Sequence, residues 1–287
     1  MIHFNSRSAV SILMTLFFLT AVACNSSTGE SIAADPSASA PVSGNPTQDQ
    51  KPISQPTAPS GATPVVTPAP LPGASPASKP IALVYGGPGV LPGPGDTLDM
   101  AKSVAAKAGF KVIEVTQFVD SEILDSASVW VQPGGPNLSA DSYMNANGMA
   151  DQVRNFVTRG GGYVGFCGGA FSAVNNLELI AGSAWNLDEA TGKIPVKWLG
   201  ATRYMHFEHG PYLQLSDKSA EVVATYADGS TAAARSHYGK GEVFISGVHP
   251  EADQYWQPTY DPDGLDQDLA ITMLREVAKR PDPSTGE

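Results

Sequence analysis

The segment 161–173, Gly-Gly-Tyr-Val-Gly-Phe-Cys-Gly-Gly-Ala-Phe-Ser-Ala, constrains the fold more than any other part of the chain. Residues 163–166 are predicted to form a short buried strand, and a helix is predicted to begin directly after Cys167. Gly165 and Gly169 each stand two residues from the cysteine. A G-x-nucleophile-x-G sequence at a strand-to-helix turn is typical of a nucleophile elbow, because small neighbours tolerate the strained backbone that exposes the side chain. The N-terminus of the helix would favour the thiolate.

A second segment supplies partners for this thiol. A lone cysteine is more often a small buried hydrophobic residue than a nucleophile. Here, however, Gly-Val-His-Pro-Glu follows an apolar strand predicted at 242–246 and places His249 82 residues after Cys167. A thiol paired with a histidine, and that histidine with a carboxylate, can be deprotonated and can protonate a leaving group. The sequence therefore predicts Cys167 as the nucleophile, His249 as the base and acid, and Glu251 as the group that orients and stabilises the imidazole.

Strands and helices alternate around these two segments. Apolar runs predict strands at 81–85, 111–116 and 128–132, and amphipathic patterns predict helices at about 97–108, 149–158 and 264–279. Such alternation with short connections predicts an α/β fold with a right-handed, mostly parallel sheet covered by helices on both faces. Ligand sites in these sheets lie at the carboxyl ends of the strands. Both the elbow and the loop Pro133-Gly-Gly-Pro136 are expected there.

The pattern changes after residue 193. Short strands broken by Gly, Asp and Ser are predicted at about 196–198, 212–215, 221–226 and 232–236. We expect them to form antiparallel hairpins at one edge of the sheet. A polar loop carrying Tyr255 and Trp256 follows the His-Pro-Glu and is placed to cover a pocket.

Three potential metal ligands, His206, Glu208 and His209, stand close together in the same region. Their spacing matches no standard zinc motif. We favour a pocket wall at 205–210 over a metal site, and the sequence predicts no metal and no other cofactor. His237 is expected to be exposed.

Three stretches carry a resemblance to a known family: Pro133-Gly-Gly-Pro136, the Gly-Gly-Tyr-Val-Gly-Phe-Cys-Gly-Gly-Ala run, and Gly239-Lys-Gly-Glu-Val243 ahead of the His-Pro-Glu. Residues 80 to about 280 resemble the class I glutamine amidotransferase-like superfamily and, within it, the amidotransferase-like domain at the N-terminus of some eukaryotic biotin–protein ligases. The resemblance implies a three-layer, doubly wound, flavodoxin-like fold with a Cys-His-Glu triad.

The resemblance also implies an oxyanion hole. Backbone N–H groups of Gly135 and Gly168 would stabilise the charge that develops on an attacked carbonyl. The ligase-type domains more usually carry alanine at the position of Gly168. Because the backbone N–H does the work, we expect this difference to matter little.

The N-terminal quarter predicts an exported protein. Residues 1–23 combine Arg7 with a short apolar run and small residues at its end, as in a secretory signal peptide. Cys24 follows directly, as in a lipobox, and is the predicted lipidation site of a cell-envelope lipoprotein; plain secretion is the alternative. Residues 24–79 are predicted to be a disordered Pro/Ser/Ala-rich tether. The folded domain would occupy 80–281, and residues 282–287 would form a tail.

The net negative charge of the chain limits the kinds of partner that it can bind. Removal of 1–23 takes Lys+Arg from 17 to 16 against 28 acidic residues, so the formal charge falls from −11 to −12. This balance argues against nucleic-acid binding, and membrane attachment would depend on the lipid. Lipidation of Cys24 would leave Cys167 as the only thiol, so no intrachain disulfide could form.

Two functions from different classes remain open at this stage. One is an enzyme that hydrolyses an amide, γ-glutamyl or peptide bond of a small molecule or peptide through a thioester. The other is a non-catalytic ligand-binding or regulatory module of the ligase N-terminal type. Thiol acidity and dependence on His249 discriminate between them, because only the enzyme needs both. The sequence leaves the substrate and the oligomeric state undetermined.

Overall fold

The computed structural model describes residues 78–186, 190–256 and 261–278. The predicted signal peptide, Cys24, most of the tether and the tail at 282–287 lie outside the described residues. No helix among the described residues has the length and apolar character needed to cross a membrane.

The strands are β1 (Ile81–Tyr85), β2 (Lys111–Val115), β3 (Ala127–Gln132), β4 (Gly162–Phe166), β5 (Gly182–Trp185), β6 (Thr191–Trp198), β7 (Ala201–Glu208), β8 (Tyr212–Leu215), β9 (Glu221–Thr225), β10 (Thr231–Tyr238) and β11 (Gly241–Ser246). The helices are α1 (Thr97–Lys107), α2 (Ser121–Ser126), α3 (Asn137–Ala146), α4 (Met149–Thr158), α5 (Gly168–Asn175) and α6 (Gln267–Val277).

One sheet joins all of these strands. Its order is β2-β1-β3-β4-β11-β10-β9-β6-β7, with β8 paired to β10 and β5 paired to β8. The first five strands pair in parallel, and β10, β9, β6 and β7 continue the sheet in antiparallel pairs. The expected α/β sheet with antiparallel strands at one edge is therefore present, and the antiparallel part is as extensive as the parallel part. β11 joins the two parts because it pairs with β4 on one side and β10 on the other.

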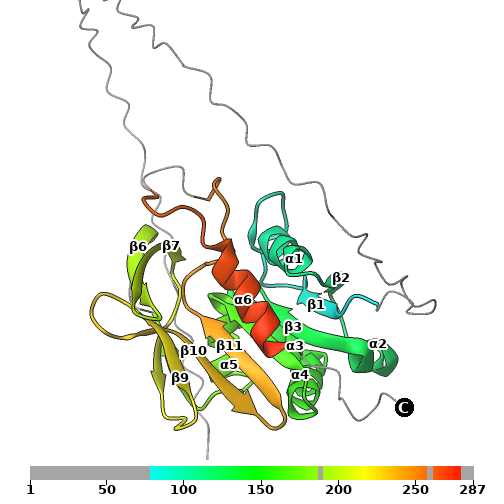
Figure 1. Ribbon diagram of the computed structural model, residues 1–287. Helices are drawn as coiled ribbons and strands as arrows, with labels where there is room; N and C mark the ends of the chain where they lie inside the picture. The colour runs from blue at the N-terminus through cyan, green and yellow to red at the C-terminus, as the bar shows by residue number, and fades with distance from the viewer. Residues whose placement is uncertain (1–77, 187–189, 257–260, 279–287) are drawn as a thin grey trace, which may run out of the picture. The chain divides into compact units, whose positions relative to one another are not determined.

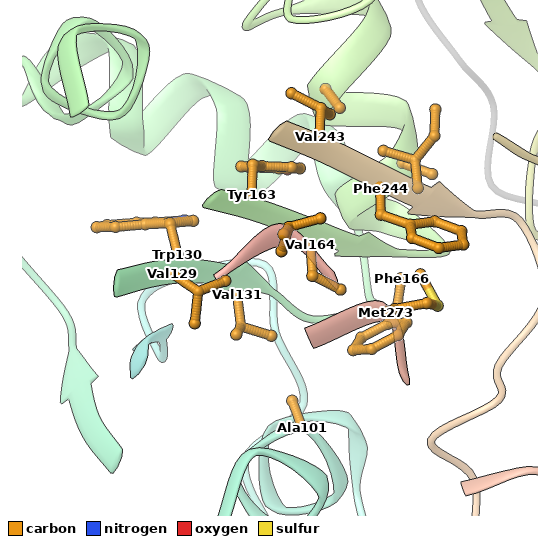
Figure 2. Close-up of a cluster of buried hydrophobic side chains, with 14 of the residues drawn as sticks. Ala101, Val129, Trp130, Val131, Tyr163, Val164, Phe166, Val243, Phe244 and Met273 are labelled. Carbon is orange, nitrogen blue, oxygen red and sulfur yellow. The ribbon is translucent and has the colours of Figure 1, made fainter. Parts of the chain in front are cut away.

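Helices cover both faces of the parallel strands. α1 and α6 pack together on one face, and α3, α4 and α5 lie on the other (Figure 1). Core side chains alternate between these faces as strand geometry requires. Figure 2 shows Trp130 and Tyr163 pointing to one face while Val131 and Val164 point to the other, the face on which Met273 of α6 also lies. All five are fully buried, and each large apolar side chain contributes about 1.5–3 kcal/mol by its burial.

Most elements match the sequence prediction, and several differ. The strand β7 (Ala201–Glu208) was predicted only as a pocket wall at 205–210, α3 was given no predicted bounds, and β6 begins at Thr191 rather than near residue 196. The hexapeptide α2 and the short strand β5 carry too little periodicity to be predicted. The closing helix α6 begins at Gln267 rather than near Gly264, because Asp266 stands at its N-cap and its carboxylate pairs with Arg203 of β7 at 2.7 Å. The fold therefore uses this acidic residue mainly to tie the helix to the antiparallel strands.

The antiparallel part curls back toward the parallel part. β7 is four strands away from β11 along the sheet. Nevertheless, the backbone N–H of His249, which follows β11, donates to the carbonyl of His206 in β7 at 2.9 Å. The end of β7 is thereby held beside the carboxyl ends of the parallel strands.

Candidate active site

Cys167 occupies a strained turn between β4 and α5. It has φ 47° and ψ −104°, a conformation that costs a non-glycine residue about 1–3 kcal/mol. Its N–H donates to Ser246 of β11 at 2.7 Å, and its carbonyl accepts the N–H of Ala170 in the first turn of α5 at 2.9 Å. These bonds to a neighbouring strand and to the helix hold the strained residue in place.

The two glycines of the elbow allow the helix to approach the sheet closely. A Cβ on Gly165 would lie 2.6 Å from the carbonyl oxygen of Gly169, and a Cβ on Gly169 would overlap the carbonyl oxygen of Gln132. The hydroxyl of Tyr163 donates to the Gly169 carbonyl at 2.8 Å. The G-x-C-x-G pattern is therefore a requirement of helix-to-sheet packing as well as of the turn.

His249 and Glu251 form a buried pair on the loop after β11. Nδ1 of His249 lies 2.8 Å from Oε1 of Glu251, and the two side chains are 3% and 0% exposed. The imidazole is fixed further by the bond of its own backbone to His206 and by the ring of Trp256, whose centroid lies 5.0 Å from that of His249. The structure therefore brings together the histidine and the carboxylate that the sequence pairs.

The charge state of His249 depends on both of its neighbours. Burial acts to lower the pKa of this imidazole, but the negative charges of Glu251 and Cys167 outweigh burial and raise the pKa well above its ordinary value. Imidazolium is thus stabilised beside the thiol. In a Cys-His pair this state supplies a thiolate nucleophile and a proton for the leaving group.

A cavity of about 350 Å³ opens above the cysteine, and we call it the reactive cavity. Cys167, His249, Gly135 and Gly168 all line it. Among the described residues, neither Gly135 nor Gly168 has a hydrogen-bond acceptor for its backbone N–H. Both predicted oxyanion-hole residues are therefore at the cavity surface with free donors, on the loop after β3 and at the start of α5.

The absence of a side chain at residue 168 matters more than the sequence suggests. A Cβ on Gly168 would overlap the carbonyl oxygen of Gly135. An alanine here would force apart the two segments predicted to form the oxyanion hole. The expectation that glycine and alanine are interchangeable at this position is therefore wrong for this backbone.

The end of β7 forms the wall that the sequence predicts for the pocket. Glu208 and His209 line the reactive cavity, and the thiol of Cys167 donates to the backbone carbonyl of Glu208 at 3.5 Å. His206 is buried, and its Nε2 lies 3.4 Å from Oε2 of Glu208. Within the described ranges, no group of three His, Cys, Asp or Glu side chains is placed to hold a metal ion.

Two features of the site escape sequence reasoning. The contact of His206 with His249 requires the curl of the sheet, which no local pattern encodes. Trp256 contacts both histidine rings and donates its indole N–H to the carbonyl of Gly95. Its position after the His-Pro-Glu indicates a covering loop but not this partner.

Comparison with known proteins gives the same fold. The family model described as "Biotin-protein ligase, N terminal" matches residues 82–193. A pyridoxal 5'-phosphate synthase subunit PdxT from Halorubrum lacusprofundi is 26% identical over 179 residues, which are 57% of this chain and 88% of that protein. The PurLQS structure from Thermotoga maritima superposes with a TM-score of 0.54 at 18% identity, covering 69% of this chain and 98% of the other. A structure described as a glutamine amidotransferase gives a TM-score of 0.50 at 19% identity, over 68% of this chain and 97% of the other.

Proposed function

We propose that this chain is a cysteine-dependent hydrolase of amide, γ-glutamyl or peptide bonds. The chain has the class I glutamine amidotransferase-like fold and matches the biotin-protein ligase N-terminal family over residues 82–193. One observation carries the proposal. A cysteine on a strained elbow shares a cavity with a histidine that is paired, fully buried, to a carboxylate.

The proposed reaction has two halves. The Cys167 thiolate attacks the amide carbonyl, forming a C–S bond, while the N–H groups of Gly135 and Gly168 stabilise the oxyanion. The C–N bond then breaks, and His249 gives its proton to the departing amine, leaving a thioester. Water next attacks the thioester with His249 as base. The C–S bond breaks, the acid leaves, and the proton returns to the Cys–His pair.

A ligand-binding module is the second candidate. The thiol donates a hydrogen bond to the backbone carbonyl of Glu208 at 3.5 Å, so the imidazole of His249 is not its only neighbouring polar group. This arrangement is compatible with a pocket that binds without turnover, although catalytic hydrogen bonds are often loose in an unliganded site.

Labelling of the thiol separates the two candidates. In the full chain carrying Cys24→Ser, Cys167 is the only cysteine, and its labelling by iodoacetamide and by a glutamine-like chloroketone is followed from about pH 5 to 9. We expect rapid labelling well below about pH 8.5, where a free thiol ionises, and its loss in His249→Ala. His237→Ala is the matched control, because His237 pairs with Glu242 at 2.9 Å but is 67% exposed.

Slow labelling that follows an ordinary thiol and ignores His249→Ala would refute the enzyme and favour the binding module. If the thiol is activated, turnover itself is tested by measuring the release of amine from a panel of amides. This release should be absent in Cys167→Ala.

Export through the signal peptide 1–23 and a lipid anchor at Cys24 is a separate part of the proposal. Support for it comes from the sequence alone. Incorporation of labelled fatty acid into the chain, lost in Cys24→Ser, is the expected result. If the chain is found to be secreted without lipid, plain secretion would take the place of the lipid anchor in this proposal.

A further inference from the structure

The carboxylate of Glu251 depends on its own backbone for its position. Oε1 pairs with His249, but Oε2 is buried and has no hydrogen-bond partner among the described residues. A buried polar atom normally has such a partner. The backbone here lies in a turn after β11, in which the N–H of Ala252 donates to the carbonyl of His249 at 3.3 Å. The place of the carboxylate therefore follows from whatever holds this turn.

The side chain of Gln267 holds the turn from α6. Its Nε2 lies 3.1 Å from the carbonyl oxygen of Glu251 and 3.4 Å from that of Ala252. A glutamine amide carries two N–H donors, one for each of these carbonyls. Gln267 thus bonds two successive peptide units beside the buried carboxylate.

α6 gives this contact a rigid base. Gln267 is its first residue, and the buried side chains of Ala270, Met273 and Leu274 pack the helix against α1, β4 and β11. The residue before Gln267 is Asp266, which is tied to β7 as described above. A positioning group on a packed helix holds its partner more precisely than a group on a loop does.

Lys107 of α1 determines which way the Gln267 amide faces. Nζ of Lys107 lies 2.6 Å from Oε1 of Gln267. An ammonium group can only donate, so it requires the carbonyl end of the amide and directs the NH₂ end toward Glu251 and Ala252. A charged donor also polarises the amide and strengthens the bonds that its N–H groups make. A chain of contacts therefore runs from the exposed Lys107 to the buried His249–Glu251 pair.

We propose that Gln267 is a positioning residue for the proposed reaction, which holds Glu251 at hydrogen-bonding distance from His249, and that Lys107 orients Gln267 for this contact. Burial lowers the pKa of His249, and the nearby charge of Glu251 opposes burial and raises this pKa. A displaced carboxylate would therefore make imidazolium, and with it the neighbouring thiolate, less stable. This inference rests on the proposed function, because it concerns the acid–base pair of the same site.

The pH profile of Cys167 labelling by iodoacetamide tests the proposal in the full chain carrying Cys24→Ser. Gln267→Met keeps roughly the length of the side chain and removes both N–H donors. We expect the midpoint of the profile to rise by about half to one pH unit, the scale of a net hydrogen bond, so that labelling below the midpoint slows about three- to tenfold. The rate on the plateau above the midpoint should not change, because the thiolate itself is the same.

Combined variants show whether Gln267 acts through Glu251. Added to Glu251→Gln, Gln267→Met should move the midpoint no further, since residues in one hydrogen-bond network are not additive. Lys107→Met should raise the midpoint by a smaller amount and should have no further effect in the Gln267→Met background. It also supplies the test should Gln267→Met fail to fold.

Gln214→Met is the matched control, because Gln214 is an exposed glutamine on β8. It should leave the midpoint unchanged. All of these variants keep Cys167 and His206, the other titratable groups that face His249.

The outcomes separate this inference from the proposed function. A folded Gln267→Met variant with an unchanged midpoint, or with rates that fall equally at all pH values, would overturn the positioning role and leave the hydrolase intact. Additive shifts with Glu251→Gln, or an equal shift in Gln214→Met, would also overturn it. Labelling of the parent chain that ignores His249→Ala would instead overturn the hydrolase.

Discussion

The buried pair of His249 and Glu251 allows a quantitative test through Glu251→Gln. The 2.8 Å separation of Nδ1 and Oε1 corresponds to about 6 kcal/mol of charge attraction at an effective dielectric constant of about 20. Glutamine can keep a hydrogen bond to the ring, and removal of the buried charge relieves desolvation. Truncation of a buried, hydrogen-bonded charge pair typically costs about 2–5 kcal/mol, and the hydrogen bond that glutamine keeps places this variant in the lower part of that range, at about 2–4 kcal/mol. We therefore expect Glu251→Gln to slow the labelling of Cys167 near neutral pH by roughly 30- to 1,000-fold.

The sign of the effect follows from the pKa of His249. Glu251 helps to raise this pKa, so its removal makes imidazolium less stable and thereby disfavours the thiolate beside it. The assay is the rate of labelling by iodoacetamide across the pH range, with denaturant unfolding measured on the same sample to confirm that the variant is folded.

Glu242→Gln is the matched control for this experiment. Glu242 also pairs with a histidine Nδ1, at 2.9 Å, but the two side chains are 67% and 44% exposed. Exposed pairs contribute about 0–1 kcal/mol, so labelling of Cys167 should not change. A folded Glu251→Gln variant that labels within threefold of the wild type would refute the role assigned to Glu251.

Two further predictions concern the framework of the site. Burial raises the pKa of Asp266 to about 6, and its Oδ2 has no partner among the described residues. Because this folded pKa exceeds the unfolded value, ionisation costs stability, and the cost is absent below about pH 4 and complete above about pH 6. The unfolding free energy of Asp266→Asn minus that of the wild type should rise by about 2–3 kcal/mol across this range; a flat or falling difference would contradict the assignment. Gly168→Ala should destabilise the chain by more than about 2 kcal/mol and slow iodoacetamide labelling at least tenfold, because its Cβ overlaps the Gly135 carbonyl. Gly200→Ala is the control, because Gly200 has φ +86° but no neighbouring atom that a Cβ would meet, and it should lower the unfolding free energy by only about 1 kcal/mol. Equal losses of unfolding free energy in the two variants would show that the overlap at residue 168 is relieved at no cost.

The sequence predicts best where local pattern and packing agree. The strand at 81–85 and the helix at 149–158 were predicted with the observed bounds, because apolar periodicity and flanking glycines mark both elements. The placement of Cys167, His249 and Glu251 in one region follows from strand polarity, since parallel strands end at the same edge of a sheet.

What could not be predicted depends on long-range geometry. The contact between His206 and His249 arises because a sheet several strands wide curls back on itself. The overlap that an alanine at 168 would cause depends on how closely the loop after β3 approaches α5. Neither the contact between the two histidines nor the close approach at residue 168 is encoded in the neighbouring residues. A motif alone therefore indicates the chemistry of the site but not which substitutions the site tolerates.

The position of β11 between β4 and β10 also determines when, during synthesis, Cys167 and its proposed partner His249 can first come together. Among the described elements β11 is the last strand, and it carries the segment with His249 into the middle of a sheet whose other strands precede it. At a synthesis rate of about 5–20 residues per second, His249 is made roughly 4–16 seconds after Cys167. During this interval the cysteine lacks the histidine and the carboxylate that are proposed to act with it. A chain truncated before β11 would lack the strand that unites the two parts of the sheet, so the proposed reactivity of Cys167 would depend on completion of the fold.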